Sequence, residues 1–235
     1  MVSDQQAKTC AHAALAAVFQ VRDTRLQVLL WQRARPPHAG AWALPGGNLD
    51  PGETLEQSIR RHLASKVDVR ELSHLEQLET RSDPNRDPLR WELATAYLGL
   101  IPADADPAIP SDTRWHPVAQ LPALAFDHKP IVLAARERLR GKLSYSNLGF
   151  AIAPATFTLS ELRDLYRAAL GHDVTATNLQ RVLLRRHLLK PVGNCREPGP
   201  SGGRPARLFT FTNQTLTITD HFATLRPPAR TAGER

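Results

Sequence analysis

Cysteines and long apolar segments are both scarce in this sequence. Its 235 residues include two cysteines, Cys10 and Cys195, which are too few for a disulfide framework and too far apart for a zinc motif. No apolar run approaches the roughly 20 residues that a helix needs to span a bilayer. The first residues also lack the basic stretch and apolar run of a signal peptide. These absences predict a cytoplasmic protein with free thiols and no membrane partner.

The charge is unevenly distributed along the chain. Residues 1–140 contain 17 Lys and Arg and 17 Asp and Glu, whereas residues 141–235 contain 13 Lys and Arg against six Asp and Glu. The whole excess of +7 therefore lies in the last 95 residues. A basic segment attracts polyanions such as nucleic acids, although a basic surface also serves solubility alone. The two parts are predicted to have different partners.

The first part has the pattern of a mixed α+β domain. Strands are expected at four apolar segments, and a polar turn, Ser82–Pro88, separates the last two. The spacing of Leu55, Ile59 and Leu63 predicts a helix over Glu53–Lys66, and Pro130–Leu143 follows as a helix with proline in its first turn. Pro102–Ser111 is expected to be a loop. The four strands are Ala11–Phe19, Leu26–Gln32, Leu72–Thr80 and Glu92–Leu100.

The second part has the order of a winged helix. Three short helices are predicted over Tyr145–Ala153, from the capping box at Thr158 to Leu170, and from the cap at Thr175 to about His187. Two strands, Lys190–Gly193 and Arg207–Thr212, surround a loop rich in glycine and proline. The expected domains are residues 1–142 and 143–225, followed by a disordered tail at residues 226–235.

One segment carries a family signature. Leu44–Glu53 reads LPGGNLDPGE, and with Arg61 it resembles the Nudix box, G-x5-E-x7-R-E-U-x-E-E-x-G-U, where U is a bulky aliphatic residue. Gly47, Glu53 and Arg61 match at the correct spacing, as do Leu63 and Val69. The resemblance covers about residues 10–140 and implies a Nudix α/β/α sandwich.

The catalytic carboxylates of that box are missing. The family holds Mg²⁺ mainly with glutamates at the positions that are His62, Ser65 and Lys66 in this chain. Mg²⁺ prefers anionic oxygen ligands, and a lysine places a positive charge where the metal would lie. Of the box carboxylates only Glu53 is left, so we expect no metal site and no catalytic residues, and we predict that pyrophosphohydrolase activity is lost.

A pocket without metal ligands can still bind a nucleotide. Lys66, Arg33 and Arg35 are candidates for contact with phosphate oxygens, although Lys66 is equally expected as an exposed helix lysine. Glu53 and Arg61 are favoured as a structural pair. In related ADP-ribose-binding Nudix domains a segment like Phe126–His128 lies beside the pocket. The predicted ligand-binding residues are Arg33, Arg35, Gly46, Gly47, Glu53, Arg61, Lys66, Phe126 and His128.

The third helix of the second part carries amide and guanidinium groups on one face. Leu179, Val182 and Leu183 share the apolar face, and Asn178 and Arg181 lie on another, with side chains that pair with adenine and guanine edges. Taken alone, this pattern favours an ordinary amphipathic helix with a basic solvated face, and the arginine-bearing hairpin that follows shifts the balance toward a DNA-binding helix. We expect base contacts from Thr175, Thr177, Asn178 and Arg181, phosphate contacts from Arg185 and Arg186, and wing contacts from Arg204 and Arg207.

Both halves together resemble the Nudix-related transcriptional regulators of the NrtR family, whose wing contains a G-G-R-P-A-like stretch, here Gly202–Ala206. The resemblance implies a homodimeric repressor of NAD-biosynthesis genes that binds a palindromic operator in double-stranded DNA. It also implies ADP-ribose or a related nucleotide as effector, with no cofactor required. Two alternatives stay open. One is an active ADP-ribose pyrophosphatase using Glu76, Glu79 or Glu92, and the other is an RNA-binding Nudix protein.

Overall fold

A computed structural model describes residues 10–196 and 205–219. The chain divides into two compact units. The first comprises residues 1–18, 28–99 and 107–135, and the second comprises residues 19–27, 100–106 and 136–235. The predicted domain limits, 1–142 and 143–225, stay a prediction. The predicted tail at 226–235 and the loop residue Arg204 lie outside the described residues.

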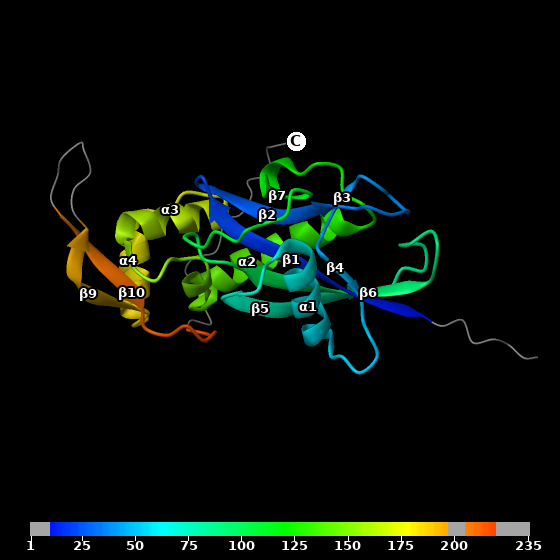
Figure 1. Cartoon of the computed structure of the whole chain (residues 1–235). Helices are drawn as coiled ribbons and strands as arrows, with labels where there is room; N and C mark the ends of the chain where they lie inside the picture. Colours follow the sequence, from blue (N-terminus) through cyan, green and yellow to red (C-terminus); the bar gives the residue numbers. More distant parts are fainter. Residues whose placement is uncertain (1–9, 197–204, 220–235) are drawn as a thin grey trace, which may run out of the picture. The chain divides into compact units, whose positions relative to one another are not determined.

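A seven-stranded sheet forms the core of the Nudix-like part of the fold (Figure 1). Five strands follow the order β3-β2-β1-β6-β5, while β4 pairs with β1 and β7 pairs with β2. The strands are β1 (Ala11–Arg22), β2 (Arg25–Gln32), β3 (Trp42–Ala43), β4 (Gly46–Asn48), β5 (His74–Arg81), β6 (Glu92–Leu100) and β7 (Thr113–Pro117).

Burial along the strands explains their positions. Ala13–Val21 in β1 and Ala94–Leu100 in β6 are buried without interruption. Strands covered on both faces need such continuous apolar runs, so β1 and β6 lie inside the sheet. The edge strand β5 is half-exposed and carries charged side chains, as edge strands commonly do. β6 has the predicted limits, whereas β1 extends beyond the predicted end at Phe19.

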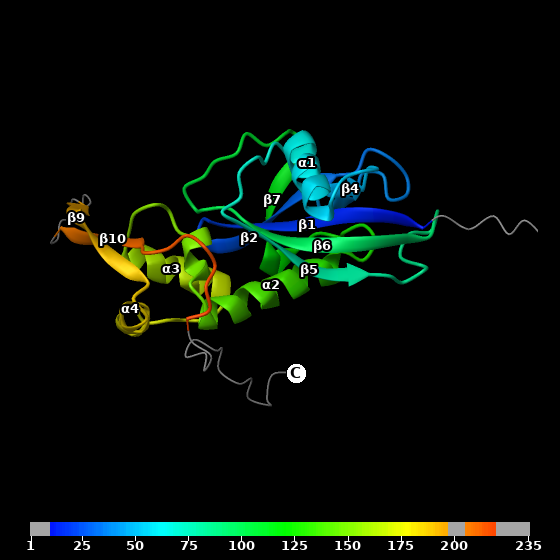
Figure 2. The same ribbon diagram turned by 90° about the horizontal axis from the view of Figure 1, so that it is seen from below.

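Two helices cover the sheet. Figure 2 shows α1 (Leu55–Val67) on one face and the beginning of α2 (His128–Tyr145) on the other, which is the predicted sandwich. Helix α1 starts at Leu55 and not at Glu53, because Thr54 caps it and shares a capping box with Gln57. It ends at Asp68, which adopts a left-handed conformation with φ of 52°.

The second unit contains the predicted helix-helix-hairpin. Its elements are α3 (Leu159–Leu170), α4 (Ala176–Arg185) and a three-stranded sheet in the order β8-β10-β9, built from β8 (Phe157–Thr158), β9 (Leu189–Arg196) and β10 (Ala206–Phe211). Thr158 caps α3 in the predicted capping box with Glu161, and Thr175 caps α4. Leu162, Tyr166 and Leu179 are fully buried between these elements.

The predicted helix over Tyr145–Ala153 is wrong. Tyr145 ends α2, and only a 3-10 helix, η2 (Leu148–Ala151), follows. The reason is that the Asn147 side chain forms hydrogen bonds with a distant segment of the chain. Its side-chain amide donates to the Thr215 carbonyl at 2.8 Å, and its carbonyl accepts from the Thr217 backbone N–H at 2.7 Å. Such side-chain contacts compete with helical backbone bonds.

Four short strands were missed: β3, β4, β7 and β8. Three of them have two or three residues, too few for any apolar alternation to be recognised in the sequence. Another 3-10 helix, η1 (Val118–Gln120), follows β7. The predicted loop over Pro102–Ser111 contains no regular element, as expected. In the described parts of the chain, no helix combines the length and the apolar character required to cross a bilayer.

Candidate ligand pocket and DNA-binding surface

A cavity of about 770 Å³ opens in the first unit. Most of its lining comes from four segments: the loop at residues 33–37, the glycine loop at residues 44–48, residues 86–92, and Phe126 with His128. Lys66 and His62 reach it from α1. The volume lies in the range of pockets for small organic ligands. The cavity therefore has the size of a site for a small organic ligand.

Most of the predicted ligand-binding residues meet at this cavity. Glu53 and Arg61 do not line it. The others line it: Arg33, Arg35, Gly46, Gly47, Lys66, Phe126 and His128.

Glu53 and Arg61 form a paired brace between the loop and the helix. Arg61 Nε donates to Glu53 Oε1 at 2.6 Å, and Arg61 Nη2 donates to Glu53 Oε2 at 2.8 Å. Arg61 also reaches Asp50 at 2.9 Å and the Asn48 carbonyl at 3.3 Å. The hydrogen bond from Arg61 is the main reason that the pKa of Glu53 falls to about 2. This geometry matches the structural pair favoured from the sequence.

The substituted box position His62 packs against the glycine loop. Its Nε2 lies 2.9 Å from the Asn48 carbonyl oxygen, so the ring donates at this nitrogen. Burial lowers the pKa of His62, with Lys66 and Arg61 acting in the same direction. A Cβ at Gly47 would lie 2.6 Å from His62 Cε1, so only glycine allows this close approach. His62 thus serves as a neutral packing residue.

Lys66 points into the cavity. Its Nζ donates to the Gly46 carbonyl at 2.5 Å and lies 4.8 Å from the centre of the Trp31 ring. Burial is the largest cause of its lowered pKa, followed by Arg33 and Arg61. The alternative of an exposed helix lysine is not what the structure shows, because the side chain is half-buried and lines the pocket.

The residues of the box do not fit a divalent cation. Both carboxylate oxygens of Glu53 accept hydrogen bonds from Arg61. Ser65 is exposed, and its hydroxyl lies 3.5 Å from the His62 carbonyl oxygen. Within residues 10–196 and 205–219, no three His, Cys, Asp or Glu side chains come together as a metal site would require. Mg²⁺ needs several oxygen ligands, and this donor set does not supply them.

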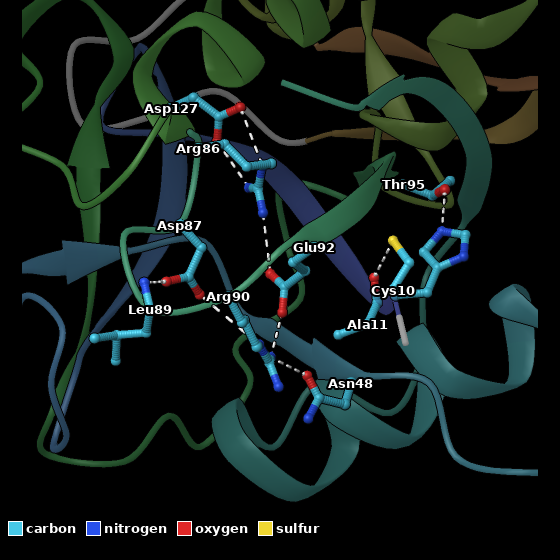
Figure 3. A network of polar contacts seen from close by, with 11 residues as sticks. Cys10, Ala11, Asn48, Arg86, Asp87, Leu89, Arg90, Glu92, Thr95 and Asp127 are labelled. Atoms are coloured by element: carbon cyan, nitrogen blue, oxygen red, sulfur yellow. Dashed lines mark hydrogen bonds and ion pairs between the residues drawn. The ribbon is translucent and has the colours of Figure 1, made fainter. Parts of the chain in front are cut away.

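The alternative carboxylates are held in ion pairs. Figure 3 shows Glu92 between two arginines: Arg86 Nη1 donates to its Oε1 at 3.0 Å, and Arg90 donates to its Oε2. Glu76 lies 3.0 Å from His74 Nε2, and Glu79 accepts from Arg81. Since these groups do not cluster with Glu53 among the described residues, they form no substitute metal site.

The same buried network connects two walls of the pocket. The Arg86 side chain is 3% exposed and also donates through Nη2 to Asp127 Oδ1 at 2.8 Å (Figure 3). Arg90 donates in addition to Asn48 Oδ1 at 2.7 Å. The residue after Asp127 begins α2, and Glu92 begins β6. Arg86 therefore ties the loop before β6 to the segment that precedes α2. The polar turn at 82–88 gave no sequence signal for this role.

Phe126, the residue before Asp127, has basic side chains around its ring. The guanidinium of Arg33 lies 4.6 Å from the centre of the Phe126 ring, and its Nε donates to the Pro37 carbonyl at 2.9 Å. The His38 ring packs edge-on against Phe126 at 4.8 Å. Phe126 has φ of 50°, an uncommon conformation for an aromatic residue. Such backbone conformations concentrate at ligand sites, where surrounding contacts hold them.

His128 is a buried neutral imidazole. Its Nδ1 accepts a hydrogen bond from the Leu44 backbone N–H at 3.0 Å. Burial lowers the pKa of His128 to about 3, so the ring is uncharged at neutral pH. The proton of the neutral ring then lies on Nε2, which makes His128 a hydrogen-bond donor in the pocket wall.

In the second unit, α4 presents the predicted polar face. Leu179, Val182 and Leu183 are buried, and the opposite side carries the exposed residues Arg181 and Arg185. The sequence-predicted base contacts Thr175 and Thr177 are also exposed, and Asn178 is half-exposed. Arg181 Nη2 donates to Asn178 Oδ1 at 2.8 Å, so these two side chains lie together on one face.

The other predicted DNA-contacting residues separate into two groups. Arg186 is half-buried and donates to the Ser144 carbonyl at 3.1 Å, which is the geometry of a structural contact within the second unit. Arg207 is exposed on β10, with its guanidinium 5.8 Å from the centre of the Phe209 ring. Arg204 lies outside the described residues.

Several pocket residues were not foreseen from the sequence, among them Trp31, Arg86 and Arg90. Trp31 is the residue before the last in β2, and the apolar pattern of that strand predicted a strand without a ligand contact. Arg86 and Arg90 lie in or beside a polar turn, where arginines are ordinary surface residues. No local signal separated them from the other arginines of the chain.

Comparison with known proteins agrees with both halves of this description. Residues 11–135 match the NUDIX domain family, and residues 149–211 match the NrtR DNA-binding winged helix domain. The ADPR responsive transcriptional repressor NtrR of Acinetobacter baylyi is 32% identical over 207 residues, which cover 84% of this chain and 80% of that protein.

Solved structures give the same result. NrtR of Shewanella oneidensis, complexed with a 27mer DNA, has a TM-score of 0.75 and 34% identity, covering 85% of this chain and 93% of that one. The NUDIX domain of the same protein, complexed with ADP ribose, has a TM-score of 0.52 and 38% identity over 57% of this chain and 90% of that one. The α+β fold class and the resemblance drawn from the sequence are confirmed: the chain belongs to the NrtR family, with a Nudix domain followed by an NrtR winged helix domain.

Proposed function

We propose that this protein is an ADP-ribose-responsive transcriptional repressor that binds double-stranded DNA through its winged helix. The observation that carries the proposal is the exposed polar face of α4, in a domain whose relative from Shewanella oneidensis was solved with DNA. That face carries Asn178, Arg181 and Arg185, and the excess positive charge of the chain lies in the same half. Amide and guanidinium groups read base edges, and the net charge favours the phosphate backbone.

The proposed contacts follow from the position of each side chain. Residues at the N-terminal end of a recognition helix lie closest to the base edges in the major groove, which assigns base contacts to Thr175, Thr177, Asn178 and Arg181. Arg185 is exposed further along the same helix, which supports it as a proposed phosphate contact. Arg207 and the loop residue Arg204 complete the proposed wing contact. The sequence predicted Arg186 as a phosphate contact, and we keep it in the proposal. Its hydrogen bond to the Ser144 carbonyl, however, favours a structural role.

We propose ADP-ribose or a related nucleotide as the effector in the 770 Å³ cavity. The support is the cationic and aromatic lining, with Arg33, Lys66 and Phe126 as its main groups, and the ADP-ribose complex of the related NUDIX domain. The proposed site keeps Gly46, Gly47, Arg35 and His128 in the wall, with Glu53 and Arg61 supporting the loop from outside. No cofactor is needed for this binding.

We propose further that the Nudix domain no longer hydrolyses pyrophosphate bonds. Glu53 is the one carboxylate left from the box, and Arg61 occupies both of its oxygens. A metal-bound water needs a cluster of hard ligands to be activated, and a lysine stands where one of those ligands would be. The domain is thus used for binding alone.

The proposed assembly is a homodimer on a palindromic operator near NAD-biosynthesis genes. A two-fold dimer of winged helices reads two half-sites about one helical turn apart, or a multiple of that spacing. A transcriptional repressor has to reach chromosomal DNA, and this requirement agrees with the cytoplasmic location expected from the sequence. The effector changes the DNA affinity only to the extent that it binds one conformational state of the protein more tightly than another. The coupling free energy between two such sites is typically about 1–3 kcal/mol.

A gel-shift titration tests the proposal. The full chain is mixed with promoter DNA from the NAD-biosynthesis genes of its own genome at moderate salt, with and without ADP-ribose. We expect a discrete complex whose apparent Kd changes at least fivefold when ADP-ribose is added. A shuffled DNA of equal length is the matched control. Equal binding to both DNAs, or a preference for RNA, would contradict the operator assignment.

A further inference from the structure

The position of Lys66 is fixed by the backbone of the glycine loop. Its Nζ donates to the Gly46 carbonyl at 2.5 Å. Gly46 pairs with Leu15 in the sheet and has φ of 156°, and a Cβ there would lie 2.2 Å from the Ala14 carbonyl oxygen. The carbonyl that holds Lys66 therefore belongs to a rigid part of the sheet. Trp31 lies beside the ammonium at 4.8 Å and limits its movement on another side.

The carboxylates that line the same cavity all have basic partners. Glu92 is paired with Arg86 and Arg90, and Asp50 is paired with Arg61 at 2.9 Å. Asp87 accepts the Leu89 backbone N–H at 2.8 Å and lies 3.9 Å from Arg90. Each negative charge of the wall is therefore already compensated inside the protein.

The positive charge of Lys66, in contrast, is not compensated by a carboxylate among the described residues. Among the described residues no carboxylate lies within ion-pair distance of its ammonium, and its hydrogen-bond partner is a neutral carbonyl. The nearby charged groups Arg33 and Arg61 are cations, and both lower the pKa of Lys66 in addition to burial. A half-buried cation with cationic neighbours and no counter-ion favours the arrival of an anion.

We propose that the Lys66 ammonium replaces the divalent cation of Nudix hydrolases as a fixed counter-ion for the diphosphate of the effector, so that the nucleotide binds without metal. The inference rests on the proposed effector site. It adds that the Lys66 ammonium neutralises the diphosphate and that the site requires no divalent cation. Lysine binds phosphate as a point charge, and the diphosphate supplies the anion that Lys66 lacks.

At the position of Lys66, Nudix hydrolases have a glutamate, and the presence of lysine instead has two consequences. A divalent cation brought close to the ammonium is repelled, because both are positive and the side chain is partly removed from water. The diphosphate is attracted by a charge that needs no metal concentration to be present. The same residue therefore removes the metal and supplies a substitute for its charge, while Arg33 and Arg35 offer further donors in the cavity lining.

Isothermal titration of ADP-ribose into the full chain tests the inference. We expect the Kd of the wild-type protein to agree within twofold in buffer with EDTA and in buffer with MgCl₂. Lys66→Gln keeps an amide donor for the Gly46 carbonyl but loses the charge, so its affinity should fall at least tenfold in both buffers. Its dependence of Kd on NaCl concentration should also be weaker, a change that a purely structural defect does not cause.

Arg60→Gln is the matched control. Arg60 lies on the same helix and is paired with Glu56 on the exposed side, at 2.9 Å. This variant should bind ADP-ribose like the wild type, and thermal unfolding verifies that both variants fold. A second variant, Lys66→Met, removes the donor as well as the charge and should bind no better than Lys66→Gln.

The outcomes separate this inference from the proposed function. Wild-type binding that is tenfold weaker in EDTA would overturn the metal-free site and leave the effector proposal standing. Unchanged affinity in Lys66→Gln would overturn the role of the lysine. Absence of binding to the wild type in both buffers would refute ADP-ribose as effector and this inference together.

Discussion

Replacement of Arg86 by methionine is expected to destabilise the protein strongly. The Arg86 side chain is 3% exposed and contacts Glu92 and Asp127, whose side chains are 9% and 23% exposed. Removing one member of a buried ion pair costs about 3–5 kcal/mol, because the remaining charges stay buried without compensation. Glu92 keeps its bond to Arg90, so the cost should lie near the lower limit.

The expected loss is large enough to measure by thermal unfolding. For a chain of this size each kcal/mol lowers Tm by about 2–4 °C, which predicts a decrease of about 6–12 °C for Arg86→Met. Arg70→Met is the control, since Arg70 is 74% exposed and its pair with Asp68 contributes at most about 1 kcal/mol. Circular dichroism of both variants gives the comparison.

A second substitution distinguishes electrostatics from packing. If the cost comes from an uncompensated carboxylate, adding Asp127→Asn to Arg86→Met should recover part of the lost stability. A Tm of Arg86→Met within about 2 °C of the wild type would refute the reasoning. So would a double variant that is less stable than Arg86→Met by the full cost of Asp127→Asn alone. ADP-ribose binding should weaken together with stability, because Arg86 lines the pocket.

Three further predictions concern DNA, pH and catalysis. Asn178→Ala and Arg181→Ala should each cost about 1–3 kcal/mol on the cognate operator and relax base preference, while Arg185→Ala should lower the salt slope by about one contact, all measured by fluorescence anisotropy. Lys66 has a lowered pKa, and its neutral form attracts a diphosphate less than its charged form does. The affinity for ADP-ribose should therefore fall as the pH rises through that lowered pKa. Titrations of Lys66→Gln at the same pH values should show no such decrease. Incubation of ADP-ribose with the protein and Mg²⁺ or Mn²⁺ should release no AMP above buffer, with Glu53→Gln indistinguishable from wild type by chromatography; turnover abolished by Glu53→Gln would restore the hydrolase alternative.

Some elements were predictable because their signals are local. β6 has the limits expected from its apolar run, and the caps at Thr158 and Thr175 begin α3 and α4 as the capping patterns indicate. The Nudix box located the glycine loop and the first helix, although that helix begins at Leu55, after its cap Thr54, rather than at Glu53. These features depend on residues a few positions apart, which sequence patterns record well.

Other elements depend on contacts between distant segments. The predicted helix at Tyr145 failed because Asn147 bonds to the backbone of Thr215 and Thr217, about 70 positions away. The short strands β4 and β7 exist because β1 and β2 pair with them, and nothing in their own residues indicates a strand.

The sequence by itself determined the family, the order of the longer helices and strands, the loss of the box carboxylates and the location of the excess charge. Each of these depends on residue identity and spacing, which the chain records directly. Only the tertiary structure decided that Lys66 faces the pocket without a carboxylate partner, that Arg86 joins two of its walls, and that Arg186 turns toward Ser144. The physical reason is that burial and charge compensation depend on neighbours brought together by folding, and a lysine or arginine in sequence carries no mark of which neighbours those are.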